Sequence, residues 1–466
     1  MKMTQEQRTR MMLNEPVSRL IGRLALPSII SMLITSIYNM ADTFFVSQLG
    51  TSASGAVGVI FSAMAMIQAI SFTIGMGSGT NVSRALGAGR TEEARTFCSV
   101  GVITAFLTGV VLAVLGLSSL DWLVRFLGAT ETIAPYAKAY ATYIFYATPF
   151  MMSSFVMNNL LRFQGLAMYG MVGITTGGIL NMILDPILIF GLGLGTAGAA
   201  IATGISQIVS FTILLIMCNT RPDAIAISPR RFRPTARMYG RILYNGLPSL
   251  GRQGIASVAT VMLNTAAGVY GDAAIAALSI VSRFVMFINS AVIGFGQGFQ
   301  PVCGFNFGAG RYTRVREAFR FSVKVATLIL VVLVAIFLPL SRTIVTVFRP
   351  DDPDVIRIGT LAMQLQLATM PLWGFITMSN MFTQSIGYGV RATIIAAARQ
   401  GICLIPMLLI LPRALGLLGI QMAQPVADVL SLVLSIAIVG GILRQMKAMP
   451  DRAAAQDSES PARFRV

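Results

Sequence analysis

The chain has 466 residues, of which 55% are hydrophobic and only 11% are charged, and its formal net charge is +17. Soluble domains carry about 25% charged residues, so this composition excludes a soluble protein. Together with a mean hydropathy of +0.74, it indicates an integral membrane protein.

The predicted elements begin with residues 1–22, a polar segment that we expect to be cytoplasmic. Twelve apolar stretches follow, each of about 20 residues or more and so long enough for a helix to cross a hydrocarbon core of about 30 Å. They are residues 23–47, 54–79, 95–117, 135–160, 169–192, 197–218, 242–269, 274–303, 318–340, 357–385, 391–411 and 416–443. The fold class is therefore an all-α integral membrane protein with twelve transmembrane helices.

The chain divides into an N-terminal lobe (23–218), a cytoplasmic linker (219–241), a C-terminal lobe (242–443) and a tail (444–466) that we expect to be disordered. The first span is too long for a signal peptide and no cleavage pattern follows it, so we expect it to stay in the mature chain.

The two lobes are related by an internal repeat. An offset of 221 residues superimposes LPS at 26–28 on LPS at 247–249, and GAGR at 87–90 on GAGR at 308–311. An even number of spans gives both repeats the same orientation, so an axis along the membrane normal would relate them. Two pseudo-symmetric six-helix lobes around a central site are typical of secondary transporters.

Lys and Arg concentrate in segments that this topology places in the cytoplasm, most densely at residues 228–241 and 310–320. This is the positive-inside bias, and it predicts that both termini are cytoplasmic. Because basic cytoplasmic loops already account for the net charge, we expect membrane lipids as partners and no nucleic acid.

The chain contains no histidine, and its four cysteines are far apart, at Cys98, Cys218, Cys303 and Cys403. No cysteine pair has metal-ligand spacing, and no disulfide framework is readable. Without imidazole, carboxylates are left for proton or cation chemistry. No HExxH or GxSxG motif lies in a span, which disfavours an intramembrane enzyme, and we expect no catalytic residue and no cofactor.

Three acidic residues, Asp42, Asp185 and Asp428, lie inside predicted spans. Inserting a central Asp costs roughly 2.5–3.5 kcal/mol, so such residues usually face a cavity or a partner. Asn181 precedes Asp185 by one helical turn and projects from the same face. Pro186 has no N–H, so it frees a carbonyl oxygen and should kink the span. These features predict a site for H⁺ or Na⁺ at Asp185.

Asp42 and Asp185 each stand eight residues before the glycine that ends their span on the outside, which places both about 12 Å below the outer surface. Tyr140 and Thr203 lie a similar few residues below that surface in their own spans, so these four polar side chains lie at a similar depth in the membrane. Tyr38 lies one turn before Asp42 on the same face. The alternative is that these residues only bond or pack against neighbouring helices.

Asp428 coincides with Gln207 under the 221-residue offset, so this repeat position is polar in both lobes. That favours a helix-contact role for Asp428, although a functional role stays open. Arg252 and Arg283, which also lie within spans, could extend to an interface or pair with a carboxylate.

The segments ALPSIISMLITSIYNMADTFFVSQLG, LLRFQG, NMILDPILIFG and GQGFQPVCGFNFGAGR, together with the paired GAGR loops, resemble the MATE (multidrug and toxic compound extrusion) family. The likeness extends over residues 15–445 and is closest to the prokaryotic DinF-like and MepA-like branches. It implies twelve helices in two lobes. It also implies a prokaryotic plasma membrane protein that exports cationic or amphipathic small molecules in exchange for H⁺ or Na⁺ by alternating access.

Carried over residue by residue, the resemblance assigns a cation-binding role to five residues: Asp42, Tyr140, Asn181, Asp185 and Thr203. Na⁺ would be held by Asp42, Asn181, Asp185 and Thr203, and no other metal is expected. We expect the substrate cavity to include Tyr38, Asn158, Met262, Arg283 and Gln297. Gln297 stands where many relatives carry an acid, which weakens the prediction of a second cation site in the C-terminal lobe.

Two other transport functions stay open at this point. A lipid-linked saccharide flippase would share the architecture, but the DP step and the few charges in the spans argue against it. A passive channel fits less well, because the repeat and the helix-breaking prolines favour alternating access. We expect the transporter to act as a monomer, and the sequence names neither the substrate nor the coupling ion.

Overall fold

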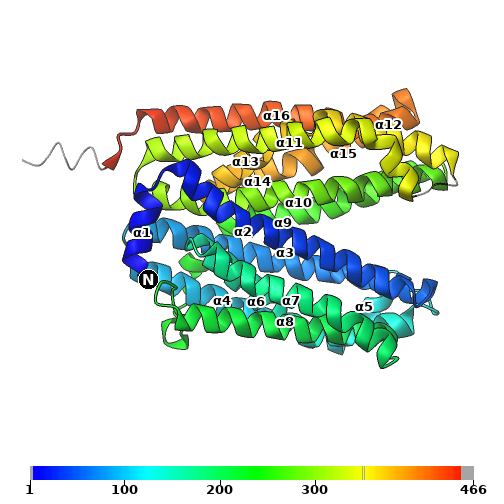
Figure 1. Ribbon diagram of the computed structural model, residues 1–466, viewed down its shortest axis with the longest axis horizontal. Helices are drawn as coiled ribbons and strands as arrows, with labels where there is room; N and C mark the ends of the chain where they lie inside the picture. Colours follow the sequence, from blue (N-terminus) through cyan, green and yellow to red (C-terminus); the bar gives the residue numbers. More distant parts are fainter. Residues whose placement is uncertain (1–3, 349, 351, 453–466) are drawn as a thin grey trace, which may run out of the picture. The chain divides into compact units, whose positions relative to one another are not determined.

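The computed structural model describes residues 4–348, 350 and 352–452 (Figure 1). Within these ranges the chain forms helices and no strand. The predicted tail, residues 444–466, lies partly outside the described residues. The α-helices are α1 (Gln5–Asn14), α2 (Val17–Ser47), α3 (Thr51–Gly87), α4 (Thr91–Ser118), α5 (Leu120–Phe126), α6 (Ala134–Phe163), α7 (Ala167–Pro186), α8 (Gly195–Thr220), α9 (Ala236–Gly268), α10 (Asp272–Gly308), α11 (Tyr312–Phe348), α12 (Pro353–Thr369), α13 (Leu372–Ser385), α14 (Gly389–Ala397), α15 (Leu404–Leu415) and α16 (Leu417–Ala448).

Each of the twelve predicted spans is helical. Among the described residues, nine helical stretches are long and apolar enough to cross a membrane. The other three predicted spans correspond to α6, to α9 and to the pair α12 and α13. The all-α prediction is therefore confirmed.

Prolines and π-turns interrupt three of the spans. The α7 helix ends at Pro186 and continues as the π-helix η1 (Ile187–Gly191), because proline cannot supply the next backbone donor. Residues 357–385, predicted as one continuous span, are instead two helices that break before Pro371. A second π-helix, η3 (Ala398–Ile402), joins α14 to α15. The sequence predicted only the first of these three breaks.

The chain forms two compact units, here called unit 1 and unit 2. Unit 1 comprises the described residues within Met1–Asn14 and Arg23–Gly246, and unit 2 comprises those within Glu15–Gly22 and Leu247–Val466. The exact lobe and linker boundaries given by the sequence stay a prediction.

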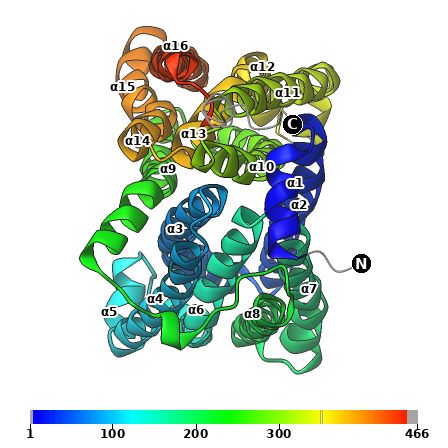
Figure 2. The ribbon, with the colours of Figure 1, turned by 90° about the vertical axis from the view of Figure 1, so that its left-hand side faces the viewer.

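Within unit 1, α6 is the central helix, packing against α3, α4, α7 and α8; Figure 2 looks along these helices. Within unit 2, the pair α12 and α13 takes the same place, since it packs against α10, α11, α14 and α16. The contacts of the two repeats therefore correspond, with one continuous helix in unit 1 matched by a broken one in unit 2.

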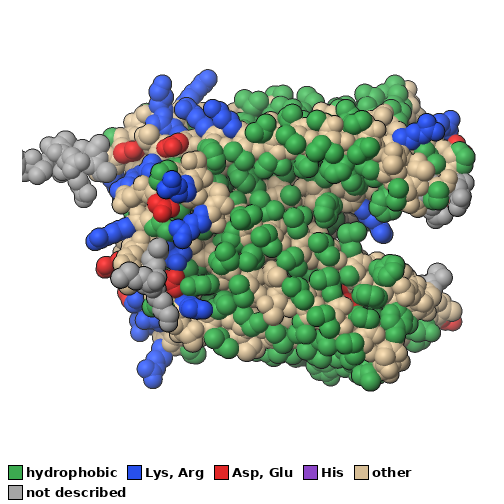
Figure 3. All heavy atoms as spheres, in the orientation of Figure 1, with side chains coloured by type: hydrophobic (Ala, Val, Ile, Leu, Met, Phe, Trp, Pro, Cys, Tyr) green, Lys and Arg blue, Asp and Glu red, His purple; other side chains and the backbone are tan. Residues whose placement is uncertain are grey.

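Small residues let these helices approach closely. Gly109 on α4 is an example, because a Cβ there would lie 2.5 Å from the Pro149 Cα on α6. On the face shown in Figure 3, hydrophobic side chains cover the middle of the helices of each unit, while most visible Lys and Arg gather at one end. This distribution suits helices surrounded by lipid.

Candidate cation site

The five predicted cation-binding residues all belong to unit 1. They come from four helices, with Asp42 on α2, Tyr140 on α6, Asn181 and Asp185 on α7, and Thr203 on α8. Asp185 is fully buried, and Asn181, Tyr140 and Thr203 are 1–6% exposed. Asp42 is half-buried.

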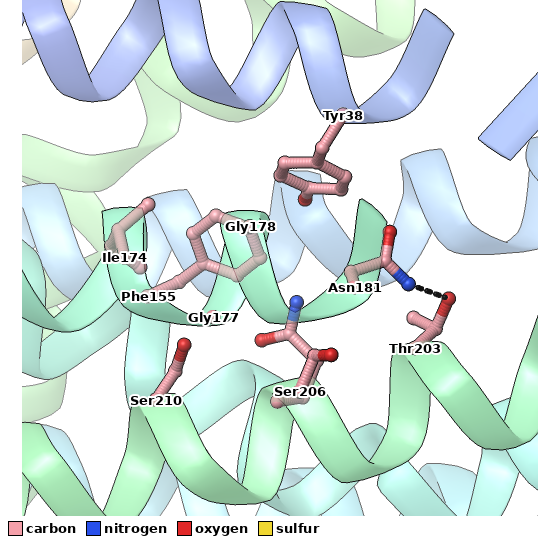
Figure 4. Close-up of a pocket in the computed structure, with 10 residues that line it drawn as sticks. Tyr38, Phe155, Ile174, Gly177, Gly178, Asn181, Thr203, Ser206 and Ser210 are labelled. Carbon is pink, nitrogen blue, oxygen red and sulfur yellow. Dashed lines mark hydrogen bonds between the residues drawn. The ribbon is translucent and has the colours of Figure 1, made fainter. Parts of the chain in front are cut away.

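Asn181 connects the other side chains of this site. Its Nδ2 donates to Asp185 Oδ1 at 3.2 Å and to Thr203 Oγ1 at 3.3 Å. Figure 4 shows Asn181 pointing from α7 toward Thr203 on α8. The one-turn spacing of Asn181 and Asp185 makes the first bond possible, whereas the second depends on the packing of α7 against α8.

The remaining two residues, Asp42 and Tyr140, are related to Asp185 electrostatically. Asp42 and Asp185 act on each other electrostatically. The buried hydroxyl of Tyr140 interacts with both of these carboxylates. The structure therefore joins Asn181, Asp185 and Thr203 by hydrogen bonds and places Asp42 and Tyr140 within electrostatic range of Asp185.

Three buried oxygen atoms in this cluster accept no hydrogen bond from any described residue. They are Asp42 Oδ1, Asn181 Oδ1 and Asp185 Oδ2. A buried acceptor without a donor costs about 1–3 kcal/mol, and more when it is charged. A bound proton or cation would supply the missing partner, so these oxygens fit either species.

A small pocket adjoins the cluster. Tyr38, Asn181 and Thr203 contribute to its wall (Figure 4), and the volume open to the centre of a water-sized sphere is about 10 Å³. About one water molecule needs that much room. The pocket therefore fits a single water or a small cation, and it is far too small for an organic substrate.

Glycines on α7 make this space. Gly177 and Gly178 line the pocket, and a Cβ on Gly178 would lie 3.1 Å from the Tyr38 ring. Without side chains at these positions, α7 leaves room between itself, α2 and α8.

Three lining residues on α8 were not predicted as part of the site: Ser206, Gln207, which was named only as the repeat partner of Asp428, and Ser210. They follow Thr203 at positions i+3, i+4 and i+7, which places all four on one helical face. That polar stripe in an apolar span was the signal that could have found them. Ser206 Oγ is also buried and has no partner among the described residues.

The donor set consists of oxygen atoms. Two carboxylates, one amide oxygen and one hydroxyl are hard oxygen ligands, which hard cations prefer. Among the described residues, no group of three or more His, Cys, Asp or Glu could hold a metal ion. The cysteines, all buried and free, add no ligand to the site.

The residues predicted to line a substrate cavity divide between the units. Tyr38 and Asn158 belong to unit 1, whereas Met262, Arg283 and Gln297 belong to unit 2. Tyr38 borders the small pocket and Gln297 is buried, while Arg283 is exposed. Their role in substrate binding stays a prediction.

Arg252 and Asp428, whose roles the sequence left open, both have partners in unit 2. Arg252 Nη1 lies 3.4 Å from Asn380 Oδ1. Asp428 forms an ion pair with Arg399, a residue that the sequence did not single out. Asp428 therefore makes the helix contact that its repeat position favoured.

Comparison with known proteins decides the family. The sequence profile of the MatE family matches residues 27–187 and 248–410, which is most of the chain and both halves of the repeat. The chain belongs to the MatE family. The two matched segments correspond to the duplicated lobes recognised from the 221-residue offset.

Individual MatE relatives cover almost the whole chain. The multidrug export protein MepA of Staphylococcus haemolyticus is 28% identical over 416 residues, covering 89% of this chain and 91% of its own. An outward-facing multidrug resistance MATE family transporter of the MOP superfamily has a TM-score of 0.88 at 25% identity, covering 94% of this chain and 99% of its own. A MOP superfamily transporter from Pyrococcus furiosus, whose reversed binding-pocket polarity suggests a different function, has a TM-score of 0.89 at 25% identity, covering 96% and 100%.

These relatives are export proteins and transporters, so this MatE chain is a multi-pass membrane transporter and not an enzyme. The twelve-helix, two-repeat fold predicted from the sequence is confirmed by the same structures.

Proposed function

We propose that this MatE protein exports small cationic or amphipathic organic compounds in exchange for H⁺ or Na⁺ that enters at Asp42 and Asp185. The names of its relatives support the substrate class, since MepA and the outward-facing transporter are described by multidrug export and resistance. The cation role rests on the chemistry of unit 1.

One observation carries the cation role: one buried oxygen each of Asp42, Asn181 and Asp185 has no donor among the described residues. A structural aspartate would have its oxygens satisfied by neighbouring helices. Here, one oxygen of each carboxylate remains available, and Asn181, which donates to Asp185, lines a pocket that fits a small cation. The cluster can therefore gain and lose a proton or Na⁺ without breaking the fold.

Coupling would follow from mutual weakening of the two ligands. If bound substrate lowers the affinity of the site for the cation by a given free energy, the bound cation lowers the affinity for the substrate by the same free energy. A cation that enters from outside then drives substrate release to the outside. Asp185 and Asp42 supply the charge in this scheme, while Asn181 and Thr203 position it. No cofactor takes part.

Dye transport under a single gradient tests the proposal. Everted membrane vesicles, whose cytoplasmic face is outward, are placed in a buffer that contains the cationic dye ethidium, and a lumen that is either acidic or rich in Na⁺ is imposed alone, so that export appears as dye uptake. We expect one gradient, and not the other, to drive transport. Transport under neither gradient, in vesicles that contain folded protein, would overturn cation coupling.

A lipid-linked saccharide flippase is the second candidate, because the Pyrococcus furiosus relative shares the fold while its pocket suggests a different function. A lipid-linked oligosaccharide analogue in proteoliposomes separates the two. Flipping of that lipid without ethidium transport would favour the second candidate.

We also propose that both termini face the cytoplasm in a prokaryotic plasma membrane and that the transporter acts as a monomer. A cysteine introduced at Gly89, in a background without the four native cysteines, should react only with reagents on the cytoplasmic side. Reaction from the outside alone would invert the topology.

A further inference from the structure

The carboxylate of Asp428 is fully buried and fully bonded. Oδ1 accepts from Arg399 Nε at 2.9 Å and from Gln424 Nε2 at 3.0 Å. Oδ2 accepts from Trp373 Nε1 at 2.7 Å and from Thr369 Oγ1 at 3.2 Å. An ionised carboxylate offers about four acceptor positions. Asp428 therefore has none left for a mobile cation, in contrast to Asp185.

The charge that balances Asp428 belongs to the chain itself. Arg399 lies on the π-helix η3, and its side chain is 15% exposed. Its guanidinium carbon is 3.5 Å from the centre of the Trp373 ring. A cation placed over an indole face is attracted by the ring electrons. The guanidinium is thus held between a carboxylate and an aromatic ring, and π-turns of this kind are frequent at functional sites.

The repeat places this cluster where unit 1 has its cation pocket. Thr203 and Gln207 on α8 both line that pocket. The 221-residue offset matches them with Gln424 and Asp428 on α16, and both of these belong to the cluster in unit 2. Two pocket positions on one helix of each repeat therefore correspond.

The facing helix completes the comparison. The offset changes from 222 residues (Gly165 to Gly387) to 221 residues (Gly195 to Gly416) across this helix, so Arg399 corresponds to Gly177 or Gly178 on α7, both of which line the pocket in unit 1. Gly178 leaves space in front of Tyr38. At the matching position, unit 2 supplies the longest cationic side chain. One repeat thus keeps an open pocket, and the other fills the pocket with a positive charge.

We propose that Arg399 is a tethered cation, whose guanidinium occupies in unit 2 the site that corresponds to the cation pocket of unit 1. Unit 2 therefore exchanges no coupling cation, and a single cation site serves the whole transporter. This inference rests on the proposed function for the role of unit 1. The capacity of the unit 2 pocket for a cation is independent of that function.

The first experiment removes the tether. The Arg399→Ala variant leaves Asp428 buried and unpaired, so its melting temperature in detergent should fall. Millimolar guanidinium chloride, far below denaturing concentrations, should restore that temperature in a saturable way, whereas choline chloride at equal ionic strength should not. The matched Arg399→Ala/Asp428→Asn variant and the wild type should not respond. No guanidinium response in Arg399→Ala, or an equal one in the double variant, would overturn the proposal.

A second variant keeps the test decisive if Arg399→Ala does not fold. Arg399→Met/Asp428→Asn removes both charges and keeps the volume, a replacement that buried ion pairs often tolerate. Ethidium export and the number of coupling cations per dye, measured from the reversal of flux in proteoliposomes, should equal the wild-type values. A changed number in the folded variant would show that unit 2 does exchange a cation.

Failure of this inference and failure of the proposed function are distinguishable. If Asp185→Asn protein keeps coupled export, the proposed function fails, whatever guanidinium does to Arg399→Ala. If guanidinium has no effect on Arg399→Ala while Asp185→Asn abolishes coupling, only the tethered cation is lost.

Discussion

Replacing Asp185 by Asn tests the cation site most directly, because it removes one negative charge and keeps the shape of the side chain. Two unit charges 4 Å apart interact by about 4 kcal/mol at an effective dielectric constant of 20, which is roughly a thousandfold in cation affinity. We therefore expect gradient-driven ethidium export by Asp185→Asn to fall to the background of vesicles without transporter.

The same substitution should leave the fold intact. The bond from Asn181 Nδ2 to Oδ1, 3.2 Å long, can persist with an amide oxygen as acceptor. Weakening it from a charged to a neutral bond costs about 1 kcal/mol. Removing a buried charge saves part of the roughly 2.5–3.5 kcal/mol that a central Asp costs to insert. The melting temperature should thus stay unchanged or rise.

Asp121→Asn is the matched control, since it makes the same chemical change at an exposed residue that pairs with Lys138 outside the site. It should export ethidium like the wild type. Full gradient-driven export by folded Asp185→Asn protein would refute the reasoning. So would a loss of export that only follows a large fall in melting temperature.

Three further predictions concern other parts of unit 1. Asp42→Asn should abolish coupled export as Asp185→Asn does, and the double variant should be little worse than either, because the two carboxylates act as one site; additive losses in vesicle assays would contradict this. Gly109→Ala should lower the free energy of unfolding by about 1–3 kcal/mol, because the added Cβ overlaps the backbone of α6. Gly58→Ala is the control and should have no such effect, because no atom lies within 4 Å of its added Cβ. Equal melting temperatures of the two variants would count against this packing. Arg8→Ala should release α1, because it leaves a buried aspartate without its ion pair, and faster hydrogen exchange confined to residues 5–14 would show it.

The sequence predicted the helices of this fold well because lipid imposes a strong requirement on their length and polarity. The predicted spans at 135–160 and 242–269 are helical even though α6 and α9 are not among the nine described helical stretches that are long and apolar enough to cross a membrane. The break before Pro371 and the π-turn at Ala398 were missed. Proline also occurs within continuous helices here, for example at Pro149 in α6, so composition alone does not locate a break.

The cation site was predictable in its charges and less so in its contacts. Asp42 and Asp185 stand out in apolar spans, and one-turn spacing relates Asn181 to Asp185. The bond from Asn181 to Thr203, in contrast, depends on how α7 packs against α8. The sequence does contain the helical spacing that places Ser206 and Ser210 on the same face as Thr203. Serine is common in membrane helices, however, so this spacing alone did not single them out.

The Arg399–Asp428 pair shows why the rest could not be predicted. The two residues are 29 positions apart, on helices whose contact no local spacing reveals. Duplication nevertheless constrains them, since the repeat preserves which helices meet while it leaves the side chains at the meeting point free to change. Where one repeat has a glycine that leaves a small pocket, the other has an arginine whose side chain places a positive charge at the matching position. Comparing the two repeats for charged residues at matched positions within spans, rather than for identical residues, would therefore have found this pair.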